Sequence, residues 1–252
     1  MNKKIFILGI VLFIIGLAGV ASILTMEVSI PAGQQAILQA RFTSQQIKLL
    51  TLINPTLMLI IAVIVGTLLY QKVCLTVPLI EKMAGIKKES INVFEIIGYG
   101  VLGGIISGVL LSFIGFIFNS ILPGEFKELG EAFQPNVAVR FLYGGLTEEI
   151  LMRFGLMTLI VWIFSKIVKG IKPIIYWIGI VTAAIIFAVG HFPVAFQAVG
   201  NPSPGLLFYI LIGNSTGGVI FGWLYWKKGL ESAFIAHIFA HVIMLLAMII
   251  LN

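Results

Sequence analysis

The chain has 252 residues, of which 60% are hydrophobic and 10% are charged, and its mean hydropathy is +1.11. This composition excludes a water-soluble globular domain and indicates an all-α membrane protein. The formal net charge of +6 does not indicate nucleic-acid binding, because the lysines cluster beside apolar segments. All acidic residues are glutamates, so the chain cannot use paired intramembrane aspartates.

Seven apolar segments follow one another along the chain and predict a polytopic transmembrane helical bundle of about seven spans, within a range of six to eight. The segments cover residues 5–25, 50–71, 94–119, 138–164, 173–198, 204–226 and 230–251. The first resembles a signal peptide, but no small-residue cleavage pattern follows it, so we interpret it as a retained span. We expect an N-terminal two-span region over residues 1–91 and a core over residues 92–252.

Basic residues are distributed unevenly between the links that alternate across the membrane. Eleven lysines fall on one side and four basic residues on the other. Because basic residues mark the cytoplasmic side, we expect an integral protein of the cell membrane with a cytoplasmic N-terminus. Of the outer links, residues 26–49 could form a surface helix, and residues 121–137 are interpreted as a solvated acidic face.

The fourth apolar segment carries three charged residues, Glu148, Glu149 and Arg153. Inserting each of these side chains into a membrane helix costs roughly 2.5–3.5 kcal/mol on insertion scales, so we expect them to have partners or a function. Glu149 and Arg153 are four residues apart and are predicted to pair on one helix face. Glu148 is turned about 100° away from Glu149 and is left free to act as a general base or acid.

All three histidines lie in apolar segments. His237 and His241 are four residues apart and share one face of the last span. His191 follows Phe187 by one helical turn, and Pro193 is expected to end or kink that helix. A lone intramembrane histidine is often a hydrogen bond between helices, but three histidines and a spare glutamate favour one shared site.

Two other interpretations remain open. A serine mechanism could use Ser215 with His237 or His241 as base, although it leaves Glu148 without a role. A non-catalytic membrane adaptor, chaperone or permease could use the same charged residues to bind a partner or to relay protons. The zinc-protease pattern H-E-x-x-H is absent from the sequence.

Three motifs together resemble those of a known family. Glu148, Glu149 and Arg153 match E-E-x-x-x-R, Phe187 and His191 match F-x-x-x-H, and His237 begins a third motif, H-x-x-x-N. Their order, on separate spans, resembles the CAAX protease and bacteriocin-processing family (CPBP, or Abi), which includes the type II CAAX prenyl endopeptidases. The resemblance covers residues 92–251, and it departs from the family where His241 replaces the usual asparagine.

The resemblance implies an intramembrane endopeptidase that is either a metalloprotease or a glutamate-dependent enzyme. Glu148 with His191 would activate water, and His237 with His241 would stabilise the oxyanion. Glu149, Arg153 and Phe187 would support the site. Alternatively, Glu148, His191 and His237 could hold Zn²⁺, with His241 as a further ligand. The implied partner is a membrane-associated peptide or protein in the lipid bilayer, CAAX-type or bacteriocin-like, and not a nucleic acid.

Overall fold

The computed structural model describes residues 3–26 and 37–251, and within them it contains helices and no strand. Seven helical segments of this part of the chain are long and apolar enough to cross a membrane. They confirm the predicted polytopic all-α bundle and an integral membrane protein. The segments are Lys3–Thr25, Ser44–Val73, Val93–Ile121, Val139–Ile167, Pro173–Val199, Pro204–Lys228 and Leu230–Ile250.

The first three spans contain α1 (Lys3–Ser22), η1 (Ile23–Thr25), α3 (Ser44–Leu50), α4 (Ile53–Leu69), η2 (Tyr70–Val73) and α6 (Val93–Ile121). Two shorter helices, α5 (Pro78–Met83) and α7 (Pro123–Ala132), lie in links. Helix α3 begins after a capping box at Thr43 and belongs to the second candidate span. The surface helix predicted in residues 26–49 stays a prediction, because residues 27–36 lie outside the described residues.

The fourth span consists of η3 (Val139–Glu148), η4 (Ile150–Met157) and α8 (Thr158–Ile167). It is followed by α9 (Pro173–Val189), α10 (Phe192–Val199), α11 (Pro204–Lys228) and α12 (Leu230–Leu251). As predicted, the helix that carries Phe187 stops before Pro193, which lies in the first turn of α10. Proline is tolerated there because its missing N–H would have no helical partner.

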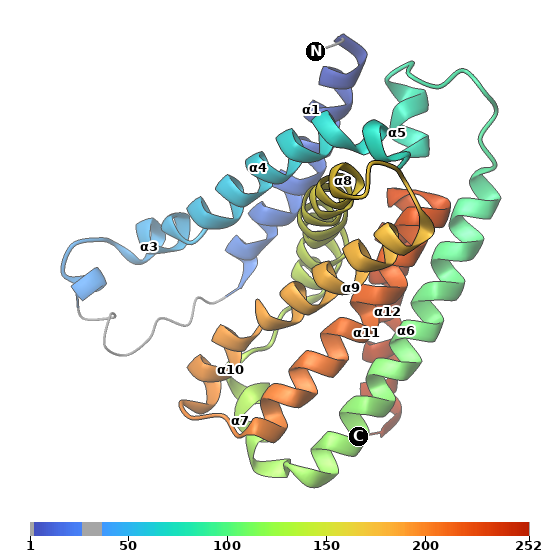
Figure 1. Cartoon of the computed structure of the whole chain (residues 1–252). Helices are drawn as coiled ribbons and strands as arrows, with labels where there is room; N and C mark the ends of the chain where they lie inside the picture. Colours follow the sequence, from blue (N-terminus) through green and yellow to red (C-terminus); the bar gives the residue numbers. More distant parts are fainter. Residues whose placement is uncertain (1–2, 27–36, 252) are drawn as a thin grey trace.

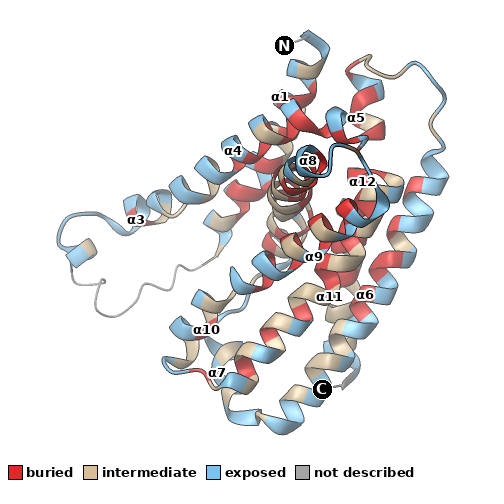
Figure 2. Ribbon diagram, in the orientation of Figure 1, coloured by how far each residue is buried: buried red, intermediate tan, exposed pale blue. Residues whose placement is uncertain are grey.

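The fourth span lies in the middle of the bundle (Figure 1). It packs against α1 and α4 on one side and against α9 and α12 on the other. The buried residues concentrate where these helices meet, and the outward faces are exposed (Figure 2). Those exposed faces are apolar, as with Phe94 at 89% exposure, because they face hydrocarbon in a membrane.

Small residues bring α6 close to α12. A Cβ atom built on Gly100 would come within 2.7 Å of the Ile235 side chain, and Gly104 and Gly108 face α12 in the same way. This glycine row therefore allows α6 and α12 to pack closely. In a membrane such contacts replace the hydrophobic burial that drives association in water.

The fourth span differs from the expected α-helical geometry, because η3 and η4 are π-helices. Their hydrogen bonds span five residues instead of four, which widens the turn. Thr147 and Thr158 follow the same spacing, since their hydroxyls donate to the carbonyls of Leu142 and Arg153. π-helical segments are rare and are frequent at functional sites, and this region carries the three charged residues Glu148, Glu149 and Arg153.

Candidate active site

The buried ion pair on the fourth span joins Oε2 of Glu149 to Nε of Arg153, 3.1 Å apart. Both side chains are inaccessible, with exposures of 0% and 1%. The guanidinium carbon also lies 5.6 Å from the centre of the Phe187 ring. The pairing predicted from the spacing of these two residues is confirmed, and the low exposure means that breaking it would leave a charge unpaired in the protein interior.

Glu149 also binds a histidine from the last span. Its Oε1 lies 2.9 Å from Nδ1 of His237, and the histidine is 6% exposed. Because a carboxylate beside Arg153 accepts hydrogen bonds, Nδ1 of His237 carries the proton. The neutral ring then presents the lone pair of Nε2, and its orientation is fixed in the way that carboxylates fix functional histidines. The spacing of residues along the sequence did not predict this contact.

The ring of His237 is stacked between two other rings, those of Phe221 and His241. The ring centres are 4.7 Å and 5.1 Å away, with interplanar angles of 22° and 21°. Both histidines face Gly144 of η3, since a Cβ atom built there would lie 3.0 Å from Nε2 of His241 and 3.8 Å from Nε2 of His237. The absence of a side chain at Gly144 therefore lets the histidines approach the fourth span.

His191 lies at the break between α9 and α10 and is partly buried. Its Nδ1 donates to the carbonyl of Phe187 at 2.8 Å, so the lone pair of the neutral ring is on Nε2. The Phe187 ring meets His191 edge-on at 4.6 Å and His237 edge-on at 6.4 Å. Phe187 thus contacts both histidines, and the fourth, fifth and seventh spans meet around it.

The neighbouring glutamates have different surroundings. Glu149 is fully buried and binds two residues, whereas Glu148 is partly buried and makes no hydrogen bond or ion pair with another residue in the described ranges. Glu148 lies near Tyr143, five residues earlier, as the wide π-helical turn allows. The predicted division into one paired and one unpaired carboxylate is therefore observed, while the catalytic role of Glu148 stays a prediction.

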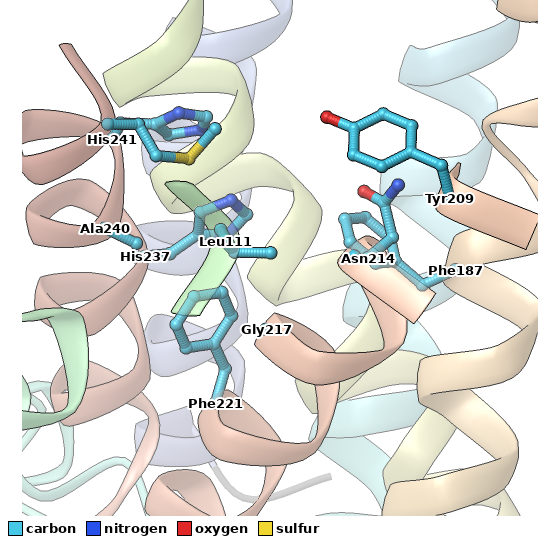
Figure 3. Close-up of a pocket in the computed structure, with 11 residues that line it drawn as sticks. Leu111, Phe187, Tyr209, Asn214, Gly217, Phe221, His237, Ala240 and His241 are labelled. Carbon is cyan, nitrogen blue, oxygen red and sulfur yellow. The ribbon is translucent and has the colours of Figure 1, made fainter. Parts of the chain in front are cut away.

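A cavity of about 130 Å³ lies beside the two histidines. His237 and His241 form one wall, and Asn214 and Tyr209 of α11 lie opposite them (Figure 3). Neither α11 residue was predicted from the sequence; the available signal was an asparagine within an apolar span. Ser215 is not among the residues that line this cavity, and its buried hydroxyl makes no hydrogen bond to the described part of the chain.

The residues proposed to hold zinc do not form a preorganised metal site. Within residues 3–26 and 37–251, no three His, Cys, Asp or Glu side chains converge closely enough to hold a metal ion. A zinc site made of Glu148, His191 and His237 would therefore need these side chains to rearrange. The use of Zn²⁺ stays a prediction.

Comparison with known proteins agrees with the motifs. A family model described as type II CAAX prenyl endopeptidase Rce1-like matches residues 131–243. This range contains the fourth span and all three motifs. No match was found with a curated protein or with a solved structure. The match to residues 131–243 supports the resemblance to the CAAX-type intramembrane endopeptidases that the three motifs predicted.

Proposed function

We propose that this protein hydrolyses a peptide bond of a membrane-associated substrate within the bilayer, with Glu148, His191, His237 and His241 as its catalytic residues. The family match supports proteolysis in general. The observation that carries the assignment of residues is the hydrogen bond between Glu149 and His237, because it orients a functional histidine through a buried, charge-paired carboxylate.

In the proposed reaction Glu148 takes a proton from a water molecule that the Nε2 atom of His191 helps to orient. The hydroxide oxygen attacks the carbonyl carbon, and the electron pair of the C=O bond moves to the oxygen. When the C–N bond breaks, the leaving nitrogen receives the proton that Glu148 holds. The products are a new carboxylate and a new amine. The unpaired state of Glu148 and the free Nε2 of His191 suit these roles.

The oxyanion would be stabilised by hydrogen bonds from His237 and His241. Nδ1 of His237 already donates to Glu149, so a donor at Nε2 requires the doubly protonated ring. Glu149 would accept the hydrogen bond of that ring while it pairs with Arg153, and the negative oxyanion would balance the added positive charge. His241 is stacked on His237, and its Nδ1 is buried without a hydrogen-bond partner in the described ranges, so its tautomer is not fixed by a neighbour.

The substrate is proposed to be a lipid-anchored or membrane-partitioned peptide of the CAAX type or a bacteriocin-like peptide. The site lies among spans whose outer faces are apolar, so a substrate reaches it from the membrane more readily than from bulk water. The cavity of about 130 Å³ is smaller than typical ligand pockets of roughly 300–1,000 Å³. It therefore holds only a short part of a substrate, and binding of an extended peptide requires the helices to part.

The test is cleavage of membrane-anchored peptides by the full chain reconstituted in liposomes. One peptide carries a farnesylated CAAX-type end, and a second spans the membrane without a prenyl group. In ¹⁸O water the new carboxylate should contain the label, as detected by mass spectrometry. We expect Glu148→Gln to abolish cleavage and Glu128→Gln, an exposed residue of α7, to leave it unchanged.

Two outcomes would contradict the proposal. Full activity of Glu148→Gln would remove Glu148 from the mechanism. Failure of the folded wild-type protein to cleave either peptide would favour the non-catalytic adaptor or permease.

A further inference from the structure

The three motifs assign no role to the wall of the cavity that lies opposite the histidines. We propose that Asn214 and Tyr209 bind the backbone of the substrate in an extended conformation and hold it against His237 and His241. This inference rests on the proposed function and adds the residues that select an unwound peptide. It is drawn from the arrangement of the four polar side chains around the cavity.

The amide of Asn214 is held in one orientation. Its Nδ2 donates to the carbonyl of Ile210 at 2.9 Å, one turn earlier on α11. The remaining oxygen, Oδ1, faces the histidine wall across the cavity (Figure 3). A carbonyl-type oxygen accepts hydrogen bonds and cannot donate them. Asn214 therefore offers an acceptor for a backbone N–H of a peptide that lies between α11 and α12.

Tyr209 is held by aromatic contacts on its ring. The ring centre lies 4.6 Å from that of Phe126 on α7 and 5.6 Å from that of Phe118 on α6. The hydroxyl points into the cavity (Figure 3) and makes no hydrogen bond to another described residue. The carboxylate of Glu125 on α7 accepts hydrogen bonds from the backbone and the hydroxyl of Ser203, both at 2.6 Å, which anchors α7 beside the start of α11.

Tyr209 and Asn214 lie on successive turns of α11, and both side chains reach the cavity (Figure 3). Five positions along an α-helix correspond to a rise of about 7.5 Å. The first and third residues of an extended chain are about 6.6 Å apart, so a short extended segment covers a similar length. The hydroxyl of Tyr209 would donate to a C=O of such a segment, and the amide oxygen of Asn214 would accept from an N–H.

The chemistry of the rest of the cavity makes these two groups necessary. Apart from the two histidines, the other side chains that line it are apolar, including Leu111, Phe221 and Met244. A helical substrate satisfies its own backbone groups, but an unwound one exposes them where water is scarce. Without an acceptor and a donor on α11, the exposed backbone groups would remain unpaired, which is unfavourable in an apolar site.

The experiment measures binding and turnover separately. Binding is followed with a fluorescent farnesylated CAAX-type peptide and the Glu148→Gln protein in lipid nanodiscs, and turnover with protein that retains Glu148. A series of peptides has each backbone amide replaced in turn by an ester, which removes one N–H. Asn214→Leu and Tyr209→Phe are compared with Thr216→Val, whose hydroxyl bonds to the Ile212 carbonyl of the same helix and does not line the cavity.

We expect Asn214→Leu to raise Kd and KM about tenfold, the value of one buried hydrogen bond, with kcat changed less than threefold. For one peptide of the series, the ester should raise Kd about tenfold when the protein retains Asn214. The same ester should not raise Kd further when the protein carries Asn214→Leu. Tyr209→Phe should weaken binding of every peptide by a similar factor, and Thr216→Val should behave as the unchanged protein. If Asn214→Leu does not accumulate, Asn214→Ala removes the same acceptor.

Equal ester effects in the Asn214 and Asn214→Leu proteins at every position would overturn the inference, as would absence of peptide binding. The proposed function can fail independently of this inference. An ester effect that depends on Asn214, without cleavage of any peptide, would keep the backbone-binding role and contradict proteolysis. Cleavage by the wild-type protein with ester effects that do not depend on Asn214 would exclude only the role of Asn214.

Discussion

Oε1 of Glu149 lies 2.9 Å from Nδ1 of His237, and this hydrogen bond joins residues 88 positions apart on the fourth and seventh spans. The second oxygen of the same carboxylate pairs with Arg153. One buried side chain thus connects the guanidinium of Arg153 to a histidine that it orients. Substitution of Glu148 should therefore affect mainly activity, whereas substitution of Glu149 should affect mainly stability.

Glu148→Gln should abolish peptide cleavage and leave stability nearly unchanged, because the partly buried Glu148 has no partner to lose in the described structure. Glu149→Gln should destabilise the protein by about 3–5 kcal/mol, because it leaves Arg153 buried without its counter-charge. Thermal unfolding in detergent and cleavage of a membrane-anchored peptide measure the two effects. Equal stability and equal activity of both variants would contradict the division of roles.

Replacing both members of the ion pair should separate its structural role from its role toward His237. Glu149→Leu with Arg153→Met should be more stable than Glu149→Leu alone, because no unpaired charge remains. The double variant should still lose activity, since Nδ1 of His237 lacks its acceptor. The unfolding midpoint and the cleavage rate are compared for the two single variants and the double variant. Recovery of activity together with stability would show that the contact with His237 is dispensable.

The docking of the first span on the fourth span depends on Gly19. A Cβ atom there would collide with the Thr147 hydroxyl and the carbonyl of Leu142, and the Thr147 hydroxyl donates to Gly16 at 2.8 Å. Gly19→Ala should destabilise the protein by about 1–3 kcal/mol, the usual cost of overpacking, and should lower activity because Thr147 adjoins the proposed base.

The matched control for this change is Gly98→Ala on α6, where nothing lies within 4 Å of the added methyl group. Unfolding and cleavage should match those of the wild type. If Gly19→Ala were equally harmless, α1 would not be rigidly docked on the fourth span.

The role of His241 can be tested by measuring bound metal. In the described residues no three ligand-type side chains are arranged to hold a metal ion, and Nδ1 of His237 is already bound to Glu149. We therefore expect activity without stoichiometric metal and a His241→Asn variant that retains activity within about tenfold. Elemental analysis of purified protein is combined with peptide cleavage. Zinc in the wild type that is lost together with activity in His241→Asn would instead identify His241 as a ligand, because an amide oxygen binds Zn²⁺ poorly.

The predicted topology can be tested with Cys74, the single cysteine of the chain, which is exposed just after the second span. The excess of basic residues on that side predicts labelling by a membrane-impermeant maleimide in inside-out vesicles and not in intact cells.

A cysteine on the opposite side of the membrane can be introduced as Ser120→Cys, at the end of α6, in a Cys74→Asn background. It should be labelled in intact cells and not in inside-out vesicles. Asparagine suits position 74, where φ is 55°, because it tolerates the left-handed conformation. Labelling of Cys74 from outside the cell would reverse the orientation.

Much of the fold followed from the sequence because a bilayer imposes simple rules. Backbone groups in hydrocarbon must be satisfied within a helix, so seven apolar runs are sufficient to predict seven spans. The pair formed by Glu149 and Arg153 and the contact between Phe187 and His191 were also predictable, since both join residues one turn apart.

Tertiary structure alone decided which spans face one another and at what height. It placed His237 on Glu149, set Asn214 opposite the histidines, and wound the fourth span as a π-helix. Nothing local in the sequence specifies these features, because apolar surfaces gain little by leaving lipid for one another. The register of the helices depends on close glycine contacts, such as Gly144 beside His241, and on buried polar pairs, which form only when distant parts of the chain meet.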